Sequence, residues 1–532
     1  MTVEQSVSAA TQAAAPAPQA KTAAEADNHT RNALTAAKGG GIVASGRLFV
    51  YGTRFILAFL MARALGADQY GLYTLAISVA TIVAGVAVLG LHTAMVRYVA
   101  ILNKKGDEAG MWGAIQIGIG LPALISTVLA IGLFALSYVV AHNIYDRPEL
   151  APMLQLMAII VPLMTLSTVL AGATHGFKKM HYAVIAQNFV QVIVRLILIA
   201  ILFFLGMQAI HALAVFGVAN LIAVGLLFYF LNKEFPLRRG LRSAKRNWRE
   251  LMGYSLPVWI SGLLRSFRSN IQVLLLGTFY TAAGVGVFNV VGRVNLVGRM
   301  AFNSISTSSR PIIAEIHSQK DRVELANIYQ TTTRWGVTVN LPIFLTLLLF
   351  SEGILAIFGD DFIAGAMAMR VLAFAELVDA FTGTCGAIID MTGLTRVKVA
   401  NSVIQLILAI TVNVLLIPKY GLMGAAVGAL IVNAAINTLR MIEVWYVFRI
   451  LPLNRTFIKP IAAALLALAV ALLVQQLLVD NMNLLLLILQ VAILFAVYAG
   501  LLLLLGLPEQ EKVIVAQARR RIAKRRLRSA KA

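Results

Sequence analysis

The sequence predicts an all-α protein that crosses a membrane many times, and its composition carries this prediction. Of the 532 residues, 59% are apolar and 13% are charged, which is about half of the ~25% charged residues typical of soluble domains. The mean hydropathy is +0.83. A soluble fold cannot bury so much apolar surface, so we expect lipid to surround most of the chain.

Fourteen apolar segments follow one another along the chain, each near the length of about 20 residues that a transmembrane helix needs. We therefore predict fourteen transmembrane helices. Their expected ranges are 42–65, 71–100, 111–140, 150–174, 181–205, 209–231, 252–279, 285–309, 332–357, 363–389, 397–417, 421–448, 457–479 and 484–506.

The two ends of the chain differ from this pattern. Residues 1–40 contain no Phe, Trp or Tyr and lack the apolar core of a signal peptide, which predicts a disordered cytoplasmic tail. Residues 508–532 are rich in Lys and Arg and predict a basic cytoplasmic tail. Two interpretations of the basic tail stay open: a solvated segment, or a surface helix held by anionic lipid head groups.

The distribution of charge orients the predicted helices. The chain carries 45 Lys and Arg against 23 Asp and Glu, a net charge of +22. Basic residues accumulate in cytoplasmic loops, and the predicted outward loops hold little beyond Arg147 and Lys419 when the first helix starts inside. We therefore expect a multi-pass protein of the plasma (inner) membrane with both termini cytoplasmic. The positive charge belongs to these loops, so no nucleic-acid partner is expected.

The chain resembles itself at a spacing of about 215 residues. Tyr70-Gly71-Leu72-Tyr73 corresponds to Val285-Gly286-Val287-Phe288, and two further pairs of motifs follow in the same order. We therefore predict two six-helix lobes, helices 1–6 and 7–12, related by a pseudo-two-fold axis along the membrane normal, as in transporters built from parallel repeats. The expected parts are an N-lobe at 41–232, a basic cytoplasmic linker at 233–250, a C-lobe at 251–450 and helices 13–14 at 451–507.

Several arginines fall deep inside the predicted helices, where a charge costs roughly 2.5–3.5 kcal/mol on insertion scales. They share helix faces with other polar residues; Arg265 and Arg268, for instance, continue a stripe with Ser261 and Gln272. One interpretation is a water-filled cationic cavity that binds the substrate. The alternative is that each Arg ties helices together through carbonyl oxygens. The candidate cavity cations are Arg54, Arg195, Arg265, Arg268, Arg293 and Arg299.

The first eight predicted helices hold no Asp or Glu that could neutralise these arginines. The planar guanidinium group suits phosphate in particular, so an anionic substrate is expected to bring the missing charge. Helix 10 differs, because Glu376 and Asp379 share one of its faces. This pair is a candidate for binding a driving proton or sodium ion. The alternative is an ion pair with Arg370 or another C-lobe Arg.

Sequence signatures of enzymes and cofactor sites are not found. The chain has no Walker A motif, its histidines are dispersed, and Cys385 is its single cysteine, so no metal site and no cofactor are expected. The predicted helices leave no sizeable soluble domain for a catalytic site. We therefore predict a transporter rather than an enzyme, coupled at most to a proton or sodium ion.

Short motifs spread over residues 41–507 resemble bacterial oligosaccharide flippases and polysaccharide exporters of the multidrug/oligosaccharidyl-lipid/polysaccharide (MOP) exporter superfamily. The resemblance implies two six-helix lobes, alternating access, and a cationic cavity with which Arg54, Arg265 and Arg268 are comparable in place. The motifs are Arg63-Ala64-Leu65-Gly66, Tyr70-Gly71-Leu72-Tyr73, Leu89-Gly90-Leu91 before Arg97-Tyr98, Ser255-Leu256-Pro257 and Met391-Thr392-Gly393.

The resemblance implies a flippase that moves an undecaprenyl-pyrophosphate-linked oligosaccharide across the plasma membrane for surface polysaccharide biosynthesis. One alternative is a flippase for lipid II, the peptidoglycan precursor, and another is a drug/cation antiporter of the same fold. A membrane-embedded glycan polymerase or ligase is disfavoured, because the longest loop is cytoplasmic. The expected partners are the lipid-linked glycan, membrane lipids, and a polysaccharide polymerase and glycosyltransferases of the same pathway, with the chain itself a monomer.

Overall fold

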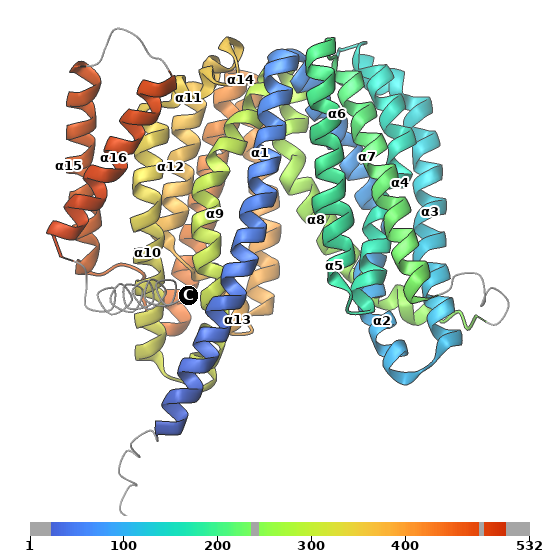
Figure 1. Cartoon of the computed structure of the whole chain (residues 1–532), viewed down its shortest axis with the longest axis horizontal. Helices are drawn as coiled ribbons and strands as arrows, with labels where there is room; N and C mark the ends of the chain where they lie inside the picture. Colours follow the sequence, from blue (N-terminus) through green and yellow to red (C-terminus); the bar gives the residue numbers. More distant parts are fainter. Residues whose placement is uncertain (1–22, 236–243, 478–483, 507–532) are drawn as a thin grey trace, which may run out of the picture. The chain divides into compact units, whose positions relative to one another are not determined.

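The computed structural model describes residues 23–235, 244–477 and 484–506, and all regular structure in these ranges is helical (Figure 1). The chain divides into two units, Met1–Tyr51 and Gly52–Ala532, and the packing described below lies within the second. Helix α1 begins at Ala23, so residues 23–40 of the predicted N-terminal tail are helical. Residues 1–22 and the predicted basic tail at 508–532 lie outside the described residues.

The helices of the first half of the chain pack against one another. Helix α4 packs against α2, α3 and α7, and α7 packs against α6. The elements are α1 (Ala23–Ala87), α2 (Leu91–Lys105), α3 (Glu108–Val139), η2 (Val140–Ile144), α4 (Leu150–Gly176), α5 (Met180–Ala183), η3 (Val184–Val190), α6 (Gln191–Leu205) and α7 (Ala209–Glu234).

The second half forms a corresponding group in which α12 packs against α9, α10 and α14, while α15 and α16 pair and lie on α10. Helix α8 contacts both groups, through α2 and through α14. The elements are α8 (Trp248–Phe279), α9 (Ala282–Ser318), α10 (Arg322–Leu349), α11 (Ser351–Ala356), η4 (Asp360–Gly365), α12 (Ala366–Thr382), α13 (Cys385–Met391), α14 (Thr395–Phe448), η5 (Arg455–Phe457), α15 (Ile458–Leu477) and α16 (Leu484–Leu504).

Two of the predicted links between neighbouring helices are kinks rather than loops. Helix α1 passes through Gly66 at φ 68°, and α14 passes through Gly421 at φ 54°. A left-handed backbone is open to glycine without the steric cost that a side chain adds. Each kink therefore joins two predicted transmembrane segments into one continuous element.

Some predicted segments are interrupted instead. The segment 71–100 breaks at residues 88–90, where Leu89 and Gly90 have positive φ, and it resumes as α2. The carbonyl of Val86, near the end of α1, accepts a hydrogen bond of 3.1 Å from the indole nitrogen of Trp259 on α8. A neighbouring helix thus adds a hydrogen bond to a carbonyl at the break, which also accepts a weaker one of 3.4 Å from the Leu89 backbone N–H. Similarly, the segment 363–389 breaks at Gly383, between α12 and α13.

In the part of the chain that the structure describes, eight helical segments are long and apolar enough to cross a membrane by length and composition. Helices α8, α9 and α10 are as long but are not among the eight. Helices α8 and α9 carry the deep arginines at 265, 268, 293 and 299. Four of the predicted cavity arginines therefore lie in two helices outside the eight, whereas Arg54 and Arg195 lie in segments among the eight.

Candidate functional site

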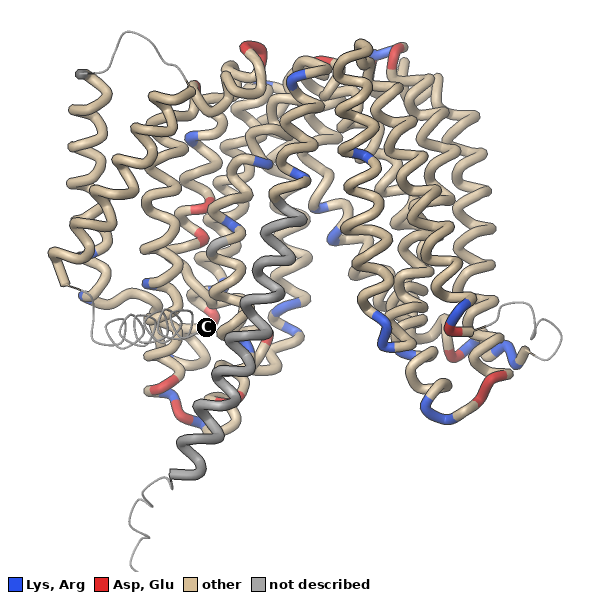
Figure 2. Tube along the Cα trace, viewed as in Figure 1, with Lys and Arg blue, Asp and Glu red and all other residues tan. Residues whose placement is uncertain are grey.

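Helix α8 presents two arginines in its middle. Arg265 and Arg268 are exposed within the structure, and neither makes an ion pair or a hydrogen bond to any of the described residues. In Figure 2 several basic positions lie at mid-height of the helices near the centre of the view, away from the charged helix ends. Arg265 and Arg268 thus have no counter-charge among the described residues. The sequence-based prediction is that an anionic substrate supplies it.

Further cations surround this pair. Arg268 lies close enough to Arg265, to Arg299 of α9 and to Arg440 of α14 for their charges to repel one another. Arg440 was not among the predicted cavity residues; its guanidinium donates to the amides of Asn437 and Gln405, at 3.3 and 3.4 Å. The structure thus gathers guanidinium groups from three helices.

Arg299 differs from its neighbours because a carboxylate compensates it. It forms an ion pair with Glu376 of α12, in which the Arg299 Nε donates to Oε2 at 3.2 Å and a terminal nitrogen donates to Oε1. The sequence prediction that Arg299 lacks a counter-charge is therefore wrong. It counted the carboxylates of the first eight helices, whereas the partner of Arg299 comes from the tenth.

The carboxylates of α12 have separate environments. Glu376 forms an ion pair, which is the alternative to binding a driving ion, and its partner is Arg299. Arg370 donates instead to Glu352 at 2.9 Å. One turn further along, Asp379 accepts a hydrogen bond of 2.8 Å from the Asn437 amide. Four guanidinium groups at positions 265, 268, 299 and 440 thus face two carboxylates, at positions 376 and 379. Net positive charge remains for an anion.

Two predicted cavity cations belong to a different cluster. Arg195 of α6 donates to the Tyr73 hydroxyl at 2.8 Å and lies over the Phe216 ring, 4.9 Å from its centroid. Arg293 donates to Asn289 Oδ1 at 2.8 Å, and the Tyr70 hydroxyl donates to the same oxygen. The structure does not place Arg195 and Arg293 with Arg265 and Arg268. Periodicity placed Arg195 on a polar face, but Tyr73 of α1 and Phe216 of α7 contact it there, while Arg293 has its partner Asn289 one turn away on its own helix.

Arg54, the remaining predicted cation, is exposed on α1. Among the described residues, no group of three or more His, Cys, Asp or Glu side chains is arranged to hold a metal ion.

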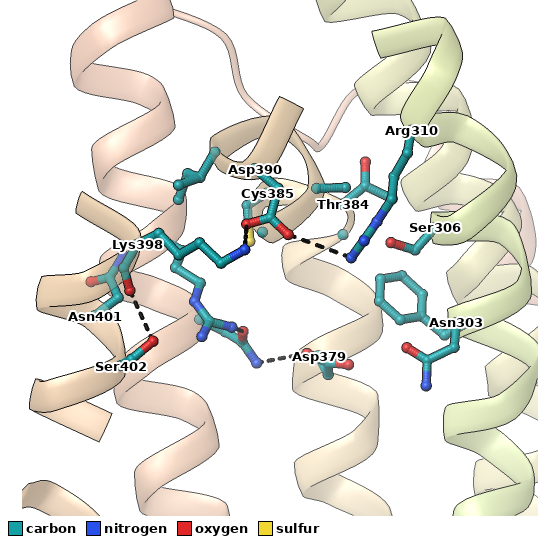
Figure 3. Close-up of a pocket in the computed structure, with 17 residues that line it drawn as sticks. Asn303, Ser306, Arg310, Asp379, Thr384, Cys385, Asp390, Lys398, Asn401 and Ser402 are labelled. Carbon is teal, nitrogen blue, oxygen red and sulfur yellow. Dashed lines mark hydrogen bonds and ion pairs between the residues drawn. The ribbon is translucent and has the colours of Figure 1, made fainter. Parts of the chain in front are cut away.

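The sequence interpretation missed a polar pocket of about 260 Å³ between α9, α12, α13 and α14 (Figure 3). At one side of it, Asp390 pairs with Lys398 at 2.8 Å and with Arg310 at 3.5 Å. Asp379 and Arg440 line the same pocket. These residues come from four different helices, so spacing along a single helix gave no signal for their convergence.

Comparison with known families agrees with the fold. A model of the family described as "Polysaccharide biosynthesis protein" matches residues 36–317, which is more than half of the chain. A second model, MatE, matches residues 257–415.

Three curated relatives have names that mention glycans or sporulation. The probable low-salt glycan biosynthesis flippase Agl15 of Haloferax volcanii is 24% identical over 194 residues, which is 36% of this chain and 41% of that protein. Capsular polysaccharide biosynthesis protein CapF of Staphylococcus aureus is 23% identical, over 37% of this chain and 50% of its own length. The match thus spans half or less of both relatives. Stage V sporulation protein B of Bacillus subtilis is 22% identical, covering 75% and 81%.

Two solved structures share the fold. The lipid II flippase MurJ in an inward closed conformation has a TM-score of 0.70 at 14% identity, covering 86% of this chain and 97% of that one. A multidrug resistance MATE family transporter of the MOP superfamily, in an inward-facing conformation, has a TM-score of 0.62 at 16% identity, covering 75% and 94%. The fold is therefore that of multi-pass membrane transporters.

Proposed function

Because the chain belongs to the polysaccharide biosynthesis protein family of the MOP superfamily, we propose that it flips an undecaprenyl-pyrophosphate-linked oligosaccharide across the plasma membrane for surface polysaccharide biosynthesis. Alternating access of a central cationic cavity would move the glycan. The observation that carries the proposal is the pair Arg265 and Arg268, which are exposed in mid-helix and lack a counter-charge among the described residues.

The pyrophosphate is the part of such a substrate that this cluster suits. Guanidinium groups bind phosphate oxygens through paired, charge-assisted hydrogen bonds. Arg265 and Arg268 are the proposed direct ligands, and Arg54 and Arg299 the proposed neighbours. Arg299 would act through its ion pair with Glu376, which orients the guanidinium. We leave Arg195 and Arg293 out of the site, because their partners lie around Tyr70 and Tyr73.

The proposed mechanism uses fourteen helices in two lobes, with an N-lobe at 41–232, a linker at 233–250, a C-lobe at 251–450, two further helices at 451–507 and both termini in the cytoplasm. The contact between the two lobes supports this arrangement. A Cβ atom on Gly71 would meet the carbonyl of Ala282, and one on Gly286 would meet the carbonyl of Ala67. The two helices thus approach each other through equivalent glycines.

For the driving force, we propose that Asp379, with Glu376, binds a proton or a sodium ion. Asp379 is not in a salt bridge with any described residue and accepts a hydrogen bond from Asn437. Both carboxylates face the arginine cluster, so a bound cation and a bound pyrophosphate would influence each other. A polysaccharide polymerase and glycosyltransferases are the proposed pathway partners, and the proposed activity is transport without a chemical reaction.

Reconstitution tests the proposed function. The full-length protein in proteoliposomes should expose undecaprenyl-pyrophosphate-linked oligosaccharide to a membrane-impermeant glycan-binding protein faster than empty liposomes do. Lipid II is presented in parallel, because a lipid II flippase differs only in the glycan that it accepts. Faster movement of lipid II would favour that alternative. Movement of an organic cation in exchange for protons, without movement of either lipid, would favour the antiporter and overturn the proposal.

A further inference from the structure

The pocket between α9, α12, α13 and α14 has a chemical character different from that of the arginine cluster. Its lining mixes hydrogen-bond donors and acceptors: the side chains include Asn303 and Ser306 of α9, Thr384, and Asn401 and Asn437 of α14. Such a lining suits a ligand that both donates and accepts, as hydroxyl groups do. An apolar substrate would leave these groups unpaired.

The charges of the lining are largely compensated, which disfavours a second anion site. Asp390 forms ion pairs with both Lys398 and Arg310, at 2.8 and 3.5 Å, and Figure 3 shows both side chains turned toward it. The three cations and two carboxylates of the lining leave one net positive charge. Arg440 lines the same pocket and lies within electrostatic range of Asp379. Because each of these cations already has an ion-pair or amide partner, the expected ligand is polar and uncharged where it contacts this pocket.

One acceptor in the lining calls for a donor. The Asn401 side chain is 2% exposed, and its amide nitrogen donates to Glu443 at 2.6 Å. Its Oδ1 atom is buried and has no hydrogen-bond partner among the described residues. A buried acceptor without a partner costs about 1–3 kcal/mol. A ligand hydroxyl would satisfy it if the Asn401 side chain turned this oxygen toward the pocket.

The pocket also adjoins the proposed pyrophosphate site. Asp379 lines it, and one turn away on the same helix Glu376 holds Arg299. Arg440, another lining residue, lies within electrostatic range of Arg268. In a lipid-linked glycan the first sugar is bonded directly to the pyrophosphate, so a site for that sugar must lie next to the site for the phosphates.

We propose that this pocket binds the sugar ring that is attached to the pyrophosphate and so selects which lipid-linked glycans are carried. This inference rests on the proposed function and names the part of the substrate that the C-lobe recognises. The volume of about 260 Å³ is slightly below the roughly 300–1,000 Å³ of sites for drug-sized ligands. It therefore suits one pyranose ring rather than an oligosaccharide.

The test compares lipids with and without a sugar. Full-length protein in nanodiscs is titrated with undecaprenyl pyrophosphate and with the same lipid carrying one glucose, galactose or N-acetylglucosamine. Ser306→Leu and Asn303→Leu each place an apolar side chain in the lining. Ser304→Leu is the matched control, since Ser304 is exposed on the same helix and is not part of the lining.

The wild type and Ser304→Leu should bind at least one sugar-bearing lipid about tenfold more tightly than the bare lipid, which corresponds to one or two hydrogen bonds. The two pocket variants should bind all four lipids equally, with unchanged affinity for the bare one, which also shows that they fold. If both pocket variants keep the sugar preference, or if the wild type shows none, the proposal that this pocket binds the sugar is wrong, while the proposed function stands. A wild type that binds none of the lipids would overturn the proposed function as well.

Discussion

Removal of Arg265 or Arg268 is the most direct perturbation of the proposed pyrophosphate site. Neither guanidinium has a hydrogen bond or ion pair among the described residues, so Ala at either position breaks no contact with them. A hydrogen bond to a charged group is worth about 1.5–3 kcal/mol, and about 1.4 kcal/mol changes an affinity tenfold. Each substitution to Ala should therefore weaken binding of the lipid pyrophosphate about 10- to 100-fold.

Lys at the same positions separates charge from geometry. The ammonium group keeps the positive charge but loses the planar fork that binds two phosphate oxygens at once. Arg265→Lys and Arg268→Lys should therefore keep part of the affinity and of the flipping rate. Arg249→Ala is the matched control, because Arg249 is exposed near the start of the same helix, far from its middle.

The assays are binding of undecaprenyl pyrophosphate in nanodiscs and flipping in proteoliposomes, each normalised to the amount of protein inserted. The Ala variants should insert at least as well as the wild type, because an Arg at mid-helix costs roughly 2.5–3.5 kcal/mol on insertion. Normal flipping by both Ala variants would refute the cationic cavity. If they instead fail because they disappear from the membrane, the arginines serve to hold helices together.

Three further predictions concern topology, coupling and the helix break. In a Cys385→Ala background, a cysteine at position 240, which lies outside the described residues, should be labelled only from the cytoplasm. A cysteine at position 145 should be labelled only from outside. The reverse pattern would contradict the two-lobe topology. Glu376→Gln combined with Asp379→Asn should remove the dependence of flipping on a proton or sodium gradient while binding of the bare lipid persists, and an unchanged ion dependence would leave both residues with a structural role. Trp259→Phe removes one of two donors to the Val86 carbonyl and should cost about 0.5–1.5 kcal/mol, seen as a lower melting temperature in detergent. An unchanged value would mean that the Leu89 N–H alone satisfies the carbonyl.

The sequence predicts helices better than it predicts their partners. Hydropathy and length located most segments, including the join at Gly66, because the bilayer acts on each helix separately. The sequence also shows that the helix of Arg265 and Arg268 and its neighbours in sequence offer them no carboxylate, while their role as anion ligands stays a prediction. The pairing of Arg299 with Glu376 could not, because it depends on how two helices 77 residues apart pack.

The contact between equivalent glycines connects the internal repeat with the transport mechanism. Ala67 and Gly71 differ from Ala282 and Gly286 by the 215-residue spacing of the repeat, and each glycine meets the backbone of the other pair's alanine. A reciprocal contact of this kind is what a two-fold axis produces when it passes between two equivalent surfaces. Because no side chain separates the backbones there, they approach closely and leave little room for small adjustments. In the proposed two-lobe mechanism, movement of one lobe against the other would separate this contact as a whole, which is the behaviour that alternating access requires of a seal between lobes.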